Sequence, residues 1–311
     1  MRAAWLTSLQ PIARQHRRMA IRIGISGWRY APWRGVFYPK GLPQRAELEY
    51  AAQRFGSIEI NGSFYSLQTP QSYSAWHDAT PDDFVFAVKG PRYLTHILRL
   101  KNLDKPLANF LASGVLRLGR KLGPILWQLP PNFHYKADVI EAFLAMLPRS
   151  HAQALALARR RDIARMRGRS ALAIESELPI RHAMEVRHAS FCDDAFLAQL
   201  RRHGIALVVA DTAGKWPYAE DVTADFVYIR LHGDTELYAS GYGDVALDRW
   251  ADRIRAWSSG REAADARRIG GSWPRHERRD VYCYFDNDAK VHAPFDAMAL
   301  MQRLELATAA D

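Results

Sequence analysis

Cysteine is scarce in this chain of 311 residues, which contains only Cys192 and Cys283. Two cysteines do not make a disulfide scaffold or a zinc site of the cysteine type. We expect both to be small buried hydrophobic residues rather than nucleophiles. Long hydrophobic runs are also missing, since no apolar stretch approaches the ~20 residues that a membrane span requires. The sequence therefore predicts a protein with no membrane partner.

Glycine-rich cofactor loops and targeting segments are missing too. The segment 24–27 (GISG) lacks the third glycine of a dinucleotide-binding loop, and there is no phosphate-binding P-loop. Residues 1–18 are basic but have neither a continuous apolar core nor a small-residue cleavage site, so we predict no signal peptide and a cytoplasmic location. We expect this segment to be a disordered extension or to precede a true start at Met19.

Acidic residues are outnumbered by basic ones, 33 against 43, which gives a net charge of +10. This balance indicates anionic partners. Much of the excess is arginine in the segments 159–169, 267–268 and 275–279, which we interpret as solvated loops in preference to a nucleic-acid surface. A small anionic molecule is the favoured partner and nucleic acid the alternative. No obligate protein partner is indicated.

What the sequence does contain is an alternation of strand and helix patterns. The predicted strands are 21–26, 57–61, 84–89, 123–128, 183–187, 206–211, 225–232 and 281–285. The predicted helices are 45–55, 71–76, 106–118, 137–147, 193–203, 247–257 and 294–304, with a weakly helical surface element at 152–169 and a loop at 260–277. Asp193 or Asp194 is available as the N-cap of the helix 193–203.

This order of elements predicts the fold class. Strands separated by helices favour a parallel sheet with right-handed crossovers. Eight strands are the number that closes a (β/α)8 TIM barrel. An open doubly wound sheet is the alternative, but its glycine-rich loop is missing. We therefore predict an α/β protein in which residues 19–311 form one TIM-barrel domain.

Ionisable side chains gather at the end of the fifth predicted strand, in the sequence MEVRHASF from Met184 to Phe191. Period-two alternation places Glu185 and Arg187 on one face, and His188 follows where the strand gives way to a loop. A carboxylate, a guanidinium and an imidazole are costly to bury unless they are paired or used. This favours a functional site, with an ordinary salt bridge on a solvated edge strand as the alternative.

Polar residues also end most of the other predicted strands. They are Glu59, Asn61, Lys89, Gln128, Asp211, Arg230, His232, Asn287 and Asp288. In a barrel the carboxyl ends of the strands converge on one mouth, where active sites are built. The sequence therefore predicts an active site at that mouth.

The cations at these strand ends suit an anionic ligand. Lys89, Arg187 and Arg230 are expected to hold a phosphate or carboxylate, and arginine offers two parallel hydrogen bonds. The alternative for the two arginines is a structural pair with Glu185 or Glu59.

The remaining candidates supply acid–base groups and binding contacts. The predicted catalytic residues are Glu59, Glu185, His188, Asp211 and His232. Further predicted substrate-binding residues are Asn61, His96, Gln128 and Asn287, with Trp28, Tyr30 and Tyr65 as aromatic lining. For His96 a loop imidazole bonded to backbone is the favoured alternative. We predict no metal ligands and no required cofactor, while a single divalent ion on Glu59, Glu185, Asp211 and His232 stays an open alternative.

Short motifs spread along the chain resemble the YecE-like family, also known as domain of unknown function 72. They are GISGW at 24–28 with Tyr30 and Trp33, FYP at 37–39, EIN at 59–61 with Phe64 and Tyr65, FAVK at 86–89, TH at 95–96, QLPP at 128–131, EVRH at 185–188, YIRLHG at 228–233, and YFDND at 284–288 with Ala293 and Pro294. They run in order from about residue 21 to the C-terminus. The segments 1–18, 152–169 and 260–277 do not resemble the family core.

The resemblance implies a TIM barrel of unestablished activity. By fold analogy the family lies near sugar-isomerase-like and apurinic-endonuclease-like barrels, which bind two or three divalent metals through His, Glu and Asp ligands. Here Lys89, Arg187 and Arg230 oppose a multi-metal cluster electrostatically.

Three hypotheses about function follow. The leading one is an enzyme of hydrolase or isomerase type that acts on a small anionic or phosphorylated sugar-like or nucleoside-like compound. The others are a nucleic-acid-processing barrel and a non-catalytic ligand-binding protein.

Overall fold

The computed structural model describes residues 20–271 and 278–307, so the predicted extension at 1–18 lies outside the described residues. Parallel strands form a closed barrel in the order β1 to β8, each pairing with its neighbours in sequence and β8 pairing back to β1. The strands are β1 Ile21–Ser26, β2 Ser57–Ile60, β3 Val85–Lys89, β4 Leu122–Gln128, β5 His182–Glu185, β6 Ala206–Asp211, β7 Phe226–Leu231 and β8 Asp280–Phe285. The predicted TIM barrel is confirmed, with boundaries close to those expected.

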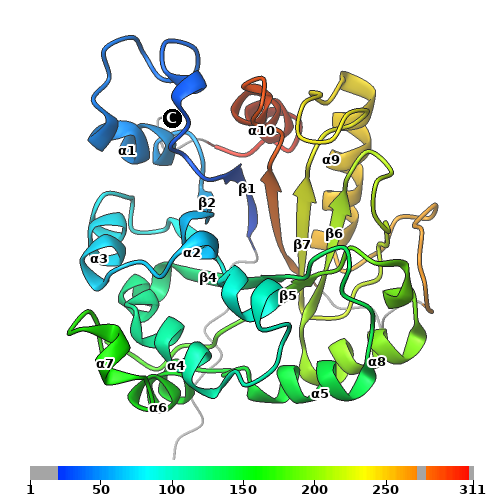
Figure 1. The fold of residues 1–311 in the computed structure, drawn as a ribbon. Coiled ribbons are helices and arrows are strands. Elements are labelled where there is room, and N and C mark those ends of the chain that lie inside the picture. The colour runs from blue at the N-terminus through cyan, green and yellow to red at the C-terminus, as the bar shows by residue number, and fades with distance from the viewer. Residues whose placement is uncertain (1–19, 272–277, 308–311) are drawn as a thin grey trace, which may run out of the picture.

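Helices surround these strands in Figure 1. They are α1 Glu47–Ala52, α2 Gly62–Tyr65, α3 Pro70–Asp78, α4 Asp104–Ala112, α5 Ala137–Met146, α6 His151–Arg159, α7 Ile163–Met166, α8 Asp194–His203, α9 Asp244–Ser258 and α10 His292–Arg303. The Asp193 side chain accepts a hydrogen bond from the Ala195 backbone N–H at 2.6 Å, which confirms one of the two predicted caps of α8. The described part of the predicted loop, 260–271, contains no helix or strand.

Two predicted boundaries differ from the structure, and one element was not predicted. The helix expected at 106–118 is α4, which ends at Ala112, because Gly114 adopts a left-handed φ of 113° and a 3-10 segment, Val115–Lys121, follows. The fifth strand ends at Glu185 rather than 187, so Arg187 and His188 belong to the following loop. The segment after β3 contains an unpredicted π-helical turn, Tyr93–Ile97.

Side chains inside the barrel form two layers. A small apolar core consists of alternate strand residues such as Ala87, Leu126, Ala183 and Tyr284. Alternation continues each of these series toward the carboxyl ends of the strands, where the next interior residue is polar, as Lys89 is after Ala87. The polar layer therefore lies directly above the apolar one, at the mouth of the barrel.

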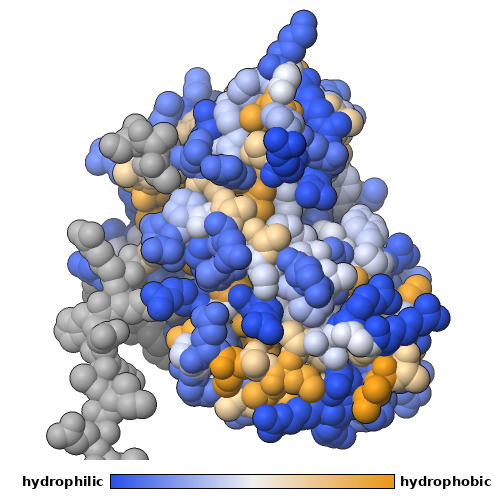
Figure 2. Space-filling view, turned by 90° about the vertical axis from the view of Figure 1, so that its left-hand side faces the viewer, coloured by the Kyte–Doolittle hydropathy of each residue, from blue (hydrophilic) through white to orange (hydrophobic). Residues whose placement is uncertain are grey.

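The outer surface is mostly hydrophilic. Figure 2 shows the face at the left of Figure 1, where hydrophobic residues gather in the lower part, at the height of α6 and α7. Ile163 at the start of α7 is 70% exposed. Cys283 is buried in β8 as expected, whereas Cys192 is exposed, because it lies in the loop that joins the 3-10 turn Ala189–Phe191 to α8.

Among residues 20–271 and 278–307, none of the helices combines the length and hydrophobicity that crossing a bilayer requires.

Candidate active site

Arg230 is the centre of the polar layer at the barrel mouth. Its guanidinium is fully buried and donates hydrogen bonds to Glu59 Oε1 at 2.9 Å and to Glu185 Oε2 at 2.7 Å. A third carboxylate, Asp286 Oδ2, accepts from Nη2 at 2.7 Å. These partners come from β2, β5 and the end of β8, so the contacts cross the barrel interior. The buried positive charge of Arg230 is thus fully compensated.

Glu59 and Glu185 have further partners that hold them in place. The Tyr228 hydroxyl donates to Glu59 Oε2 at 2.6 Å, and the Ser26 hydroxyl donates to Glu59 Oε1 at 2.5 Å. Arg187 Nε donates to Glu185 Oε1 at 2.6 Å. Burial raises the pKa of Glu185, but the charges of Arg187 and Arg230 outweigh burial and hold that pKa well below its usual range. Glu185 is therefore an anion at neutral pH.

His232 completes the cluster on the side of Asp286. Its Nδ1 lies 3.1 Å from Asp286 Oδ2, and burial together with the charge of Arg230 lowers the pKa of the imidazole. Burial raises the pKa of Asp286, but Arg230 and His232 outweigh it and hold that pKa well below its usual range. A neutral imidazole thus lies beside an ionised carboxylate.

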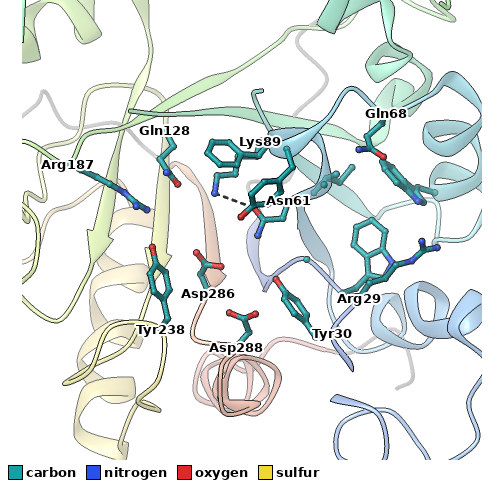
Figure 3. Close-up of a pocket in the computed structure, with 17 residues that line it drawn as sticks. Arg29, Tyr30, Asn61, Gln68, Lys89, Gln128, Arg187, Tyr238, Asp286 and Asp288 are labelled. Carbon is teal, nitrogen blue, oxygen red and sulfur yellow. Dashed lines mark hydrogen bonds between the residues drawn. The ribbon is translucent and has the colours of Figure 1, made fainter. Parts of the chain in front are cut away.

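A pocket of about 570 Å³ lies above this cluster. Its lining comes from the loops after β1 and β2 and from the ends of several strands. The lining residues are Gly27, Trp28, Arg29, Tyr30, Ile60, Asn61, Gly62, Phe64, Tyr65, Gln68, Trp76, Lys89, Gln128, Arg187, Tyr238, Asp286 and Asp288. Figure 3 shows Lys89, Gln128, Arg187 and the two aspartates around one space.

Lys89 ends β3 and is only 5% exposed. Its Nζ donates a hydrogen bond to Asn61 Oδ1 at 3.3 Å and lies 4.4 Å from the centroid of the Phe64 ring. Burial and the positive charge of Arg230 lower the pKa of Lys89 to about 8, against a smaller opposing effect of Glu59 and the other carboxylates. A share of Lys89 is therefore an uncharged amine near neutral pH.

Asp288 lines the pocket near Tyr30 in Figure 3. Burial, and then the negative charge of Asp286, raises the pKa of Asp288 to about 6. The Tyr30 hydroxyl donates to the Ser26 carbonyl at 2.6 Å, and burial raises the pKa of this phenol as well. Asp288 is therefore a carboxyl group that titrates near neutral pH, whereas Asp286 beside it does not.

Gln128 ends β4 and faces the pocket from the side opposite Asp286 in Figure 3. The side chain is buried, and its Oε1 has no hydrogen-bond partner in the part of the chain that the structure describes. A buried amide oxygen without a partner costs free energy, which a ligand that donates a hydrogen bond would recover. Arg187, also in the lining, stacks its guanidinium 3.8 Å from the Trp216 ring centroid.

The structure divides the predicted site residues into three groups. Those that line the pocket are Trp28, Tyr30, Asn61, Tyr65, Lys89, Gln128 and Arg187. Those in the buried cluster beneath it are Glu59, Glu185, Arg230 and His232. The remaining four, His96, His188, Asp211 and Asn287, are not among the lining residues.

Two of these four are histidines held by local contacts. His96 lies on the π-helical turn with its ring 5.1 Å from that of Phe64, and burial together with nearby arginines lowers the pKa of this imidazole to about 4. His188 Nδ1 accepts from the Ser190 backbone N–H at 3.1 Å, and its ring lies 3.8 Å from the His134 ring.

The other two, Asp211 and Asn287, are held by hydrogen bonds to residues that do not line the pocket. Asp211 accepts a hydrogen bond from the Tyr242 hydroxyl at 3.3 Å, and burial raises the pKa of this carboxyl. Asn287 Nδ2 donates to Asp296 Oδ2 at 2.7 Å and so ties the end of β8 to α10.

Sequence reasoning missed Asp286 and Tyr238 and gave Asp288 no role. Asp286 and Asp288 stand two residues apart after β8, and this spacing was a usable signal, because alternate residues share a face. Tyr238 lies in the irregular segment between β7 and α9, where no periodicity points to the pocket, and its ring contacts that of His232 at 5.3 Å.

Within the described ranges, no group of three or more His, Cys, Asp or Glu side chains is arranged to hold a metal ion. Of the alternative ligand set, Glu59 and Glu185 are bonded to Arg230, and Asp211 does not line the pocket.

A closed parallel barrel whose polar strand ends surround one pocket defines the chain as a (β/α)8 TIM-barrel protein with a candidate active site at the carboxyl-terminal mouth. The chain belongs to the family described as "Protein of unknown function DUF72", which matches residues 22–311. The family resemblance inferred from the motifs is thereby confirmed.

Curated relatives are similar over part of their length. The chain is 30% identical over 113 residues to the UPF0759 protein YecE of Escherichia coli K12, which covers 36% of this chain and 39% of that protein. It is 28% identical over 123 residues to the UPF0759 protein YunF of Bacillus subtilis, covering 38% and 43%. The matched region thus spans about two fifths of these relatives.

Two solved structures share the fold. A DUF72 family protein from Thermotoga maritima superposes with a TM-score of 0.68 at 23% identity, covering 92% of this chain and 99% of that one. A DUF72 family protein from Enterococcus faecalis gives a TM-score of 0.64 at 15% identity, covering 93% and 96%. At these identities the likeness shows the fold alone.

Proposed function

We propose that this protein is an enzyme of hydrolase or isomerase type that acts on a small anionic, hydroxyl-bearing compound, such as a phosphorylated sugar or nucleoside, in the pocket at the barrel mouth. The observation that carries the proposal is the composition of one pocket wall. Lys89 and Arg187 line it beside the buried amide of Gln128, whose oxygen lacks a partner among the described residues. Cations suit the anion, and the amide oxygen suits a substrate hydroxyl.

Acid–base chemistry is best supported at Asp288. A general acid or base works best when its pKa lies near the operating pH. The pKa of Asp288 is raised to about 6, and the side chain lines the pocket. Glu59 and Glu185 are less suited to the proton transfer expected of them, because both are buried and bonded to Arg230. We propose instead that Glu59, Glu185 and His232 hold Asp286 and Arg187 in position.

The aromatic lining supports a substrate with a ring. Phe64 and Tyr65 of α2 line the pocket, and so does Trp28, whose ring packs edge-on against Trp76 of α3. Apolar faces of sugars and bases stack on such rings. A substrate ring would stack on one of these side chains while its anionic group binds Arg187.

The test is isothermal titration calorimetry in phosphate-free buffer with ribose 5-phosphate, glucose 6-phosphate and adenosine 5′-monophosphate. We expect the wild type to bind at least one of them and Arg187→Ala to bind it at least ~10-fold more weakly. Arg117→Ala, which removes an exposed arginine outside the pocket, is the matched control and should bind normally. Equal affinities of wild type and Arg187→Ala, or no binding of any compound, would contradict the proposal.

Turnover of a compound that binds is then followed by NMR. Asp288→Asn should abolish turnover while leaving affinity within a few fold, because the amide keeps the shape but cannot exchange a proton at neutral pH. A fully active Asp288→Asn variant would remove Asp288 from the acid–base role.

A further inference from the structure

Two lysines in the described part of the chain, Lys89 and Lys121, are almost fully buried, and their amines differ in the number of hydrogen bonds that they donate. Lys121 is 2% exposed, and its Nζ donates to the carbonyl oxygens of His77 and Thr80 and to the Thr80 hydroxyl, at 2.7, 2.8 and 3.3 Å. All three of its N–H groups are used. Lys121 is therefore a structural residue.

Lys89 is satisfied much less well. Its Nζ donates only to Asn61 Oδ1, at 3.3 Å, and forms no ion pair with a carboxylate across residues 20–271 and 278–307. Among the charged groups, the cation Arg230 has the largest effect on the pKa of Lys89, and the Phe64 ring centroid lies 4.4 Å from the Lys89 Nζ. Burial in a pocket wall and a nearby cation both favour the uncharged form of the amine. An uncharged amine is a nucleophile and does not form a salt bridge.

We propose that Lys89 is a covalent catalytic residue, whose Nζ forms a Schiff base with a carbonyl carbon of the substrate. This inference rests on the proposed function and narrows its substrate class to anionic aldehydes or ketones, such as an open-chain ketose phosphate. Arg187 binds the anionic group through its guanidinium, and Lys89 reacts with the carbonyl.

The step balances without an outside oxidant or reductant. The Nζ lone pair attacks the carbonyl carbon, and the carbonyl oxygen takes the proton that the nitrogen releases, which gives a carbinolamine. Asp288 then protonates the hydroxyl, which leaves as water, and the carbon–nitrogen double bond forms as an iminium ion. The iminium withdraws electrons from the neighbouring carbon, whose proton Asp288, ionised by the preceding step, accepts. Reprotonation of the same carbon from its opposite face inverts that centre, and water then hydrolyses the iminium ion, which releases the carbonyl product and the free Lys89 amine. The balanced reaction is therefore an epimerisation of the carbon next to the carbonyl.

The titration of the two groups agrees with these roles. With a pKa of about 8, roughly one Lys89 in ten is an uncharged amine at neutral pH. Asp288, with a pKa of about 6, is present in both protonation states in the same range.

Borohydride trapping tests the proposal. The protein is incubated separately with dihydroxyacetone phosphate, ribulose 5-phosphate and pyruvate, sodium borohydride is added, and the intact mass and the peptide map are recorded. We expect one reduced adduct per chain with at least one probe, located on Lys89. Lys89→Arg and Lys89→Met should lower the yield at least 10-fold, whereas Lys101→Met, which removes an exposed lysine outside the pocket, should leave it unchanged.

Either of two results would overturn the proposal: no adduct on Lys89 with any of the three probes, or adducts spread evenly over exposed lysines. If Lys89→Met does not fold, Lys89→Arg and the wild-type peptide map still decide the matter. Calorimetry on the same samples separates this inference from the proposed function. If sugar phosphates bind through Arg187 but no adduct forms, the Schiff-base inference is wrong and the proposed function stands. If an adduct forms on Lys89 but no sugar phosphate binds through Arg187, the nucleophilic role of Lys89 is supported and anion binding at Arg187 is contradicted.

Discussion

Arg230 and Asp286 are joined by a 2.7 Å hydrogen bond that links the buried charge cluster to the floor of the pocket. Arg230 has no exposed surface, while Asp286 reaches the cavity. The guanidinium therefore fixes where this carboxylate lies and keeps it ionised. Arg230 affects Asp288, two residues further on, much less, and burial together with the charge of Asp286 raises the pKa of Asp288 to about 6. One arginine thus gives two nearby aspartates different chemistry.

Replacing Arg230 by Met should destabilise the protein by about 3–5 kcal/mol, because Glu59, Glu185 and Asp286 would remain buried without their main cation. Urea unfolding followed by circular dichroism measures the loss. Arg117→Met, on the exposed surface, is the control and should change stability by at most about 0.5 kcal/mol. A loss below about 1 kcal/mol for Arg230→Met would show that the cluster contributes little to the fold.

Asp288→Asn should stabilise the protein above about pH 6. The folded-state pKa of Asp288 is raised from 3.8 to about 6, so ionisation is disfavoured in the folded state. The wild type therefore loses stability as pH rises from about 4 to about 6, and the loss is complete above that window. Because the side chain is partly exposed, the gain from the substitution is about 1–2 kcal/mol. Melting temperatures of both proteins at about pH 4 and pH 8 give the comparison, and a difference that is the same at both would contradict the raised pKa.

Lys89→Met should also be stabilising, but in another pH range. Burial and Arg230 lower the pKa of Lys89 from 10.5 to about 8, while Glu59, Asp286 and Glu185 oppose them. The charged lysine therefore weakens the fold fully below about pH 8, and this effect fades as pH rises toward about 10.5. The variant should gain about 2 kcal/mol near neutral pH and much less near pH 10, as read from chemical unfolding. A gain that grows with pH would refute this account.

Gly24→Ala should prevent or severely weaken folding. A Cβ at Gly24 in β1 would lie 1.9 Å from the backbone oxygen of Ser57 in β2, and backbone in a closed barrel cannot move aside. The expected loss is about 3 kcal/mol or more. Gly243→Ala is the matched control, since its Cβ would meet nothing within 4 Å and the loss should stay within about 1 kcal/mol. Thermal unfolding of both variants provides the test, and a Gly24→Ala protein as stable as the control would contradict the predicted clash.

The two predicted anion-binding arginines show how far sequence reasoning reached. Arg230 and His232 stand two residues apart at the end of β7, as residues on one face of a strand do, and Arg230 Nη1 lies 3.3 Å from His232 Nε2 inside the barrel. Alternation does not say how deep in the barrel a side chain lies, and Arg230 proved to be enclosed by carboxylates instead of facing the pocket. Arg230 forms the structural pairs with Glu59 and Glu185 that the sequence offers as the alternative. Arg187 lies beyond the end of β5 and lines the cavity.

The sequence by itself determined the barrel, the strand order and the gathering of polar residues at one mouth. These features follow from local periodicity and from the rule that parallel strands end on one side. Only the tertiary structure decided which polar groups face the pocket and which neutralise one another beneath it. That division depends on closure of the ring, which brings Glu59, Glu185 and Asp286 from distant parts of the chain onto one guanidinium. The distances to that guanidinium lower the pKa values of Glu185 and Asp286, and no spacing along the chain encodes those distances.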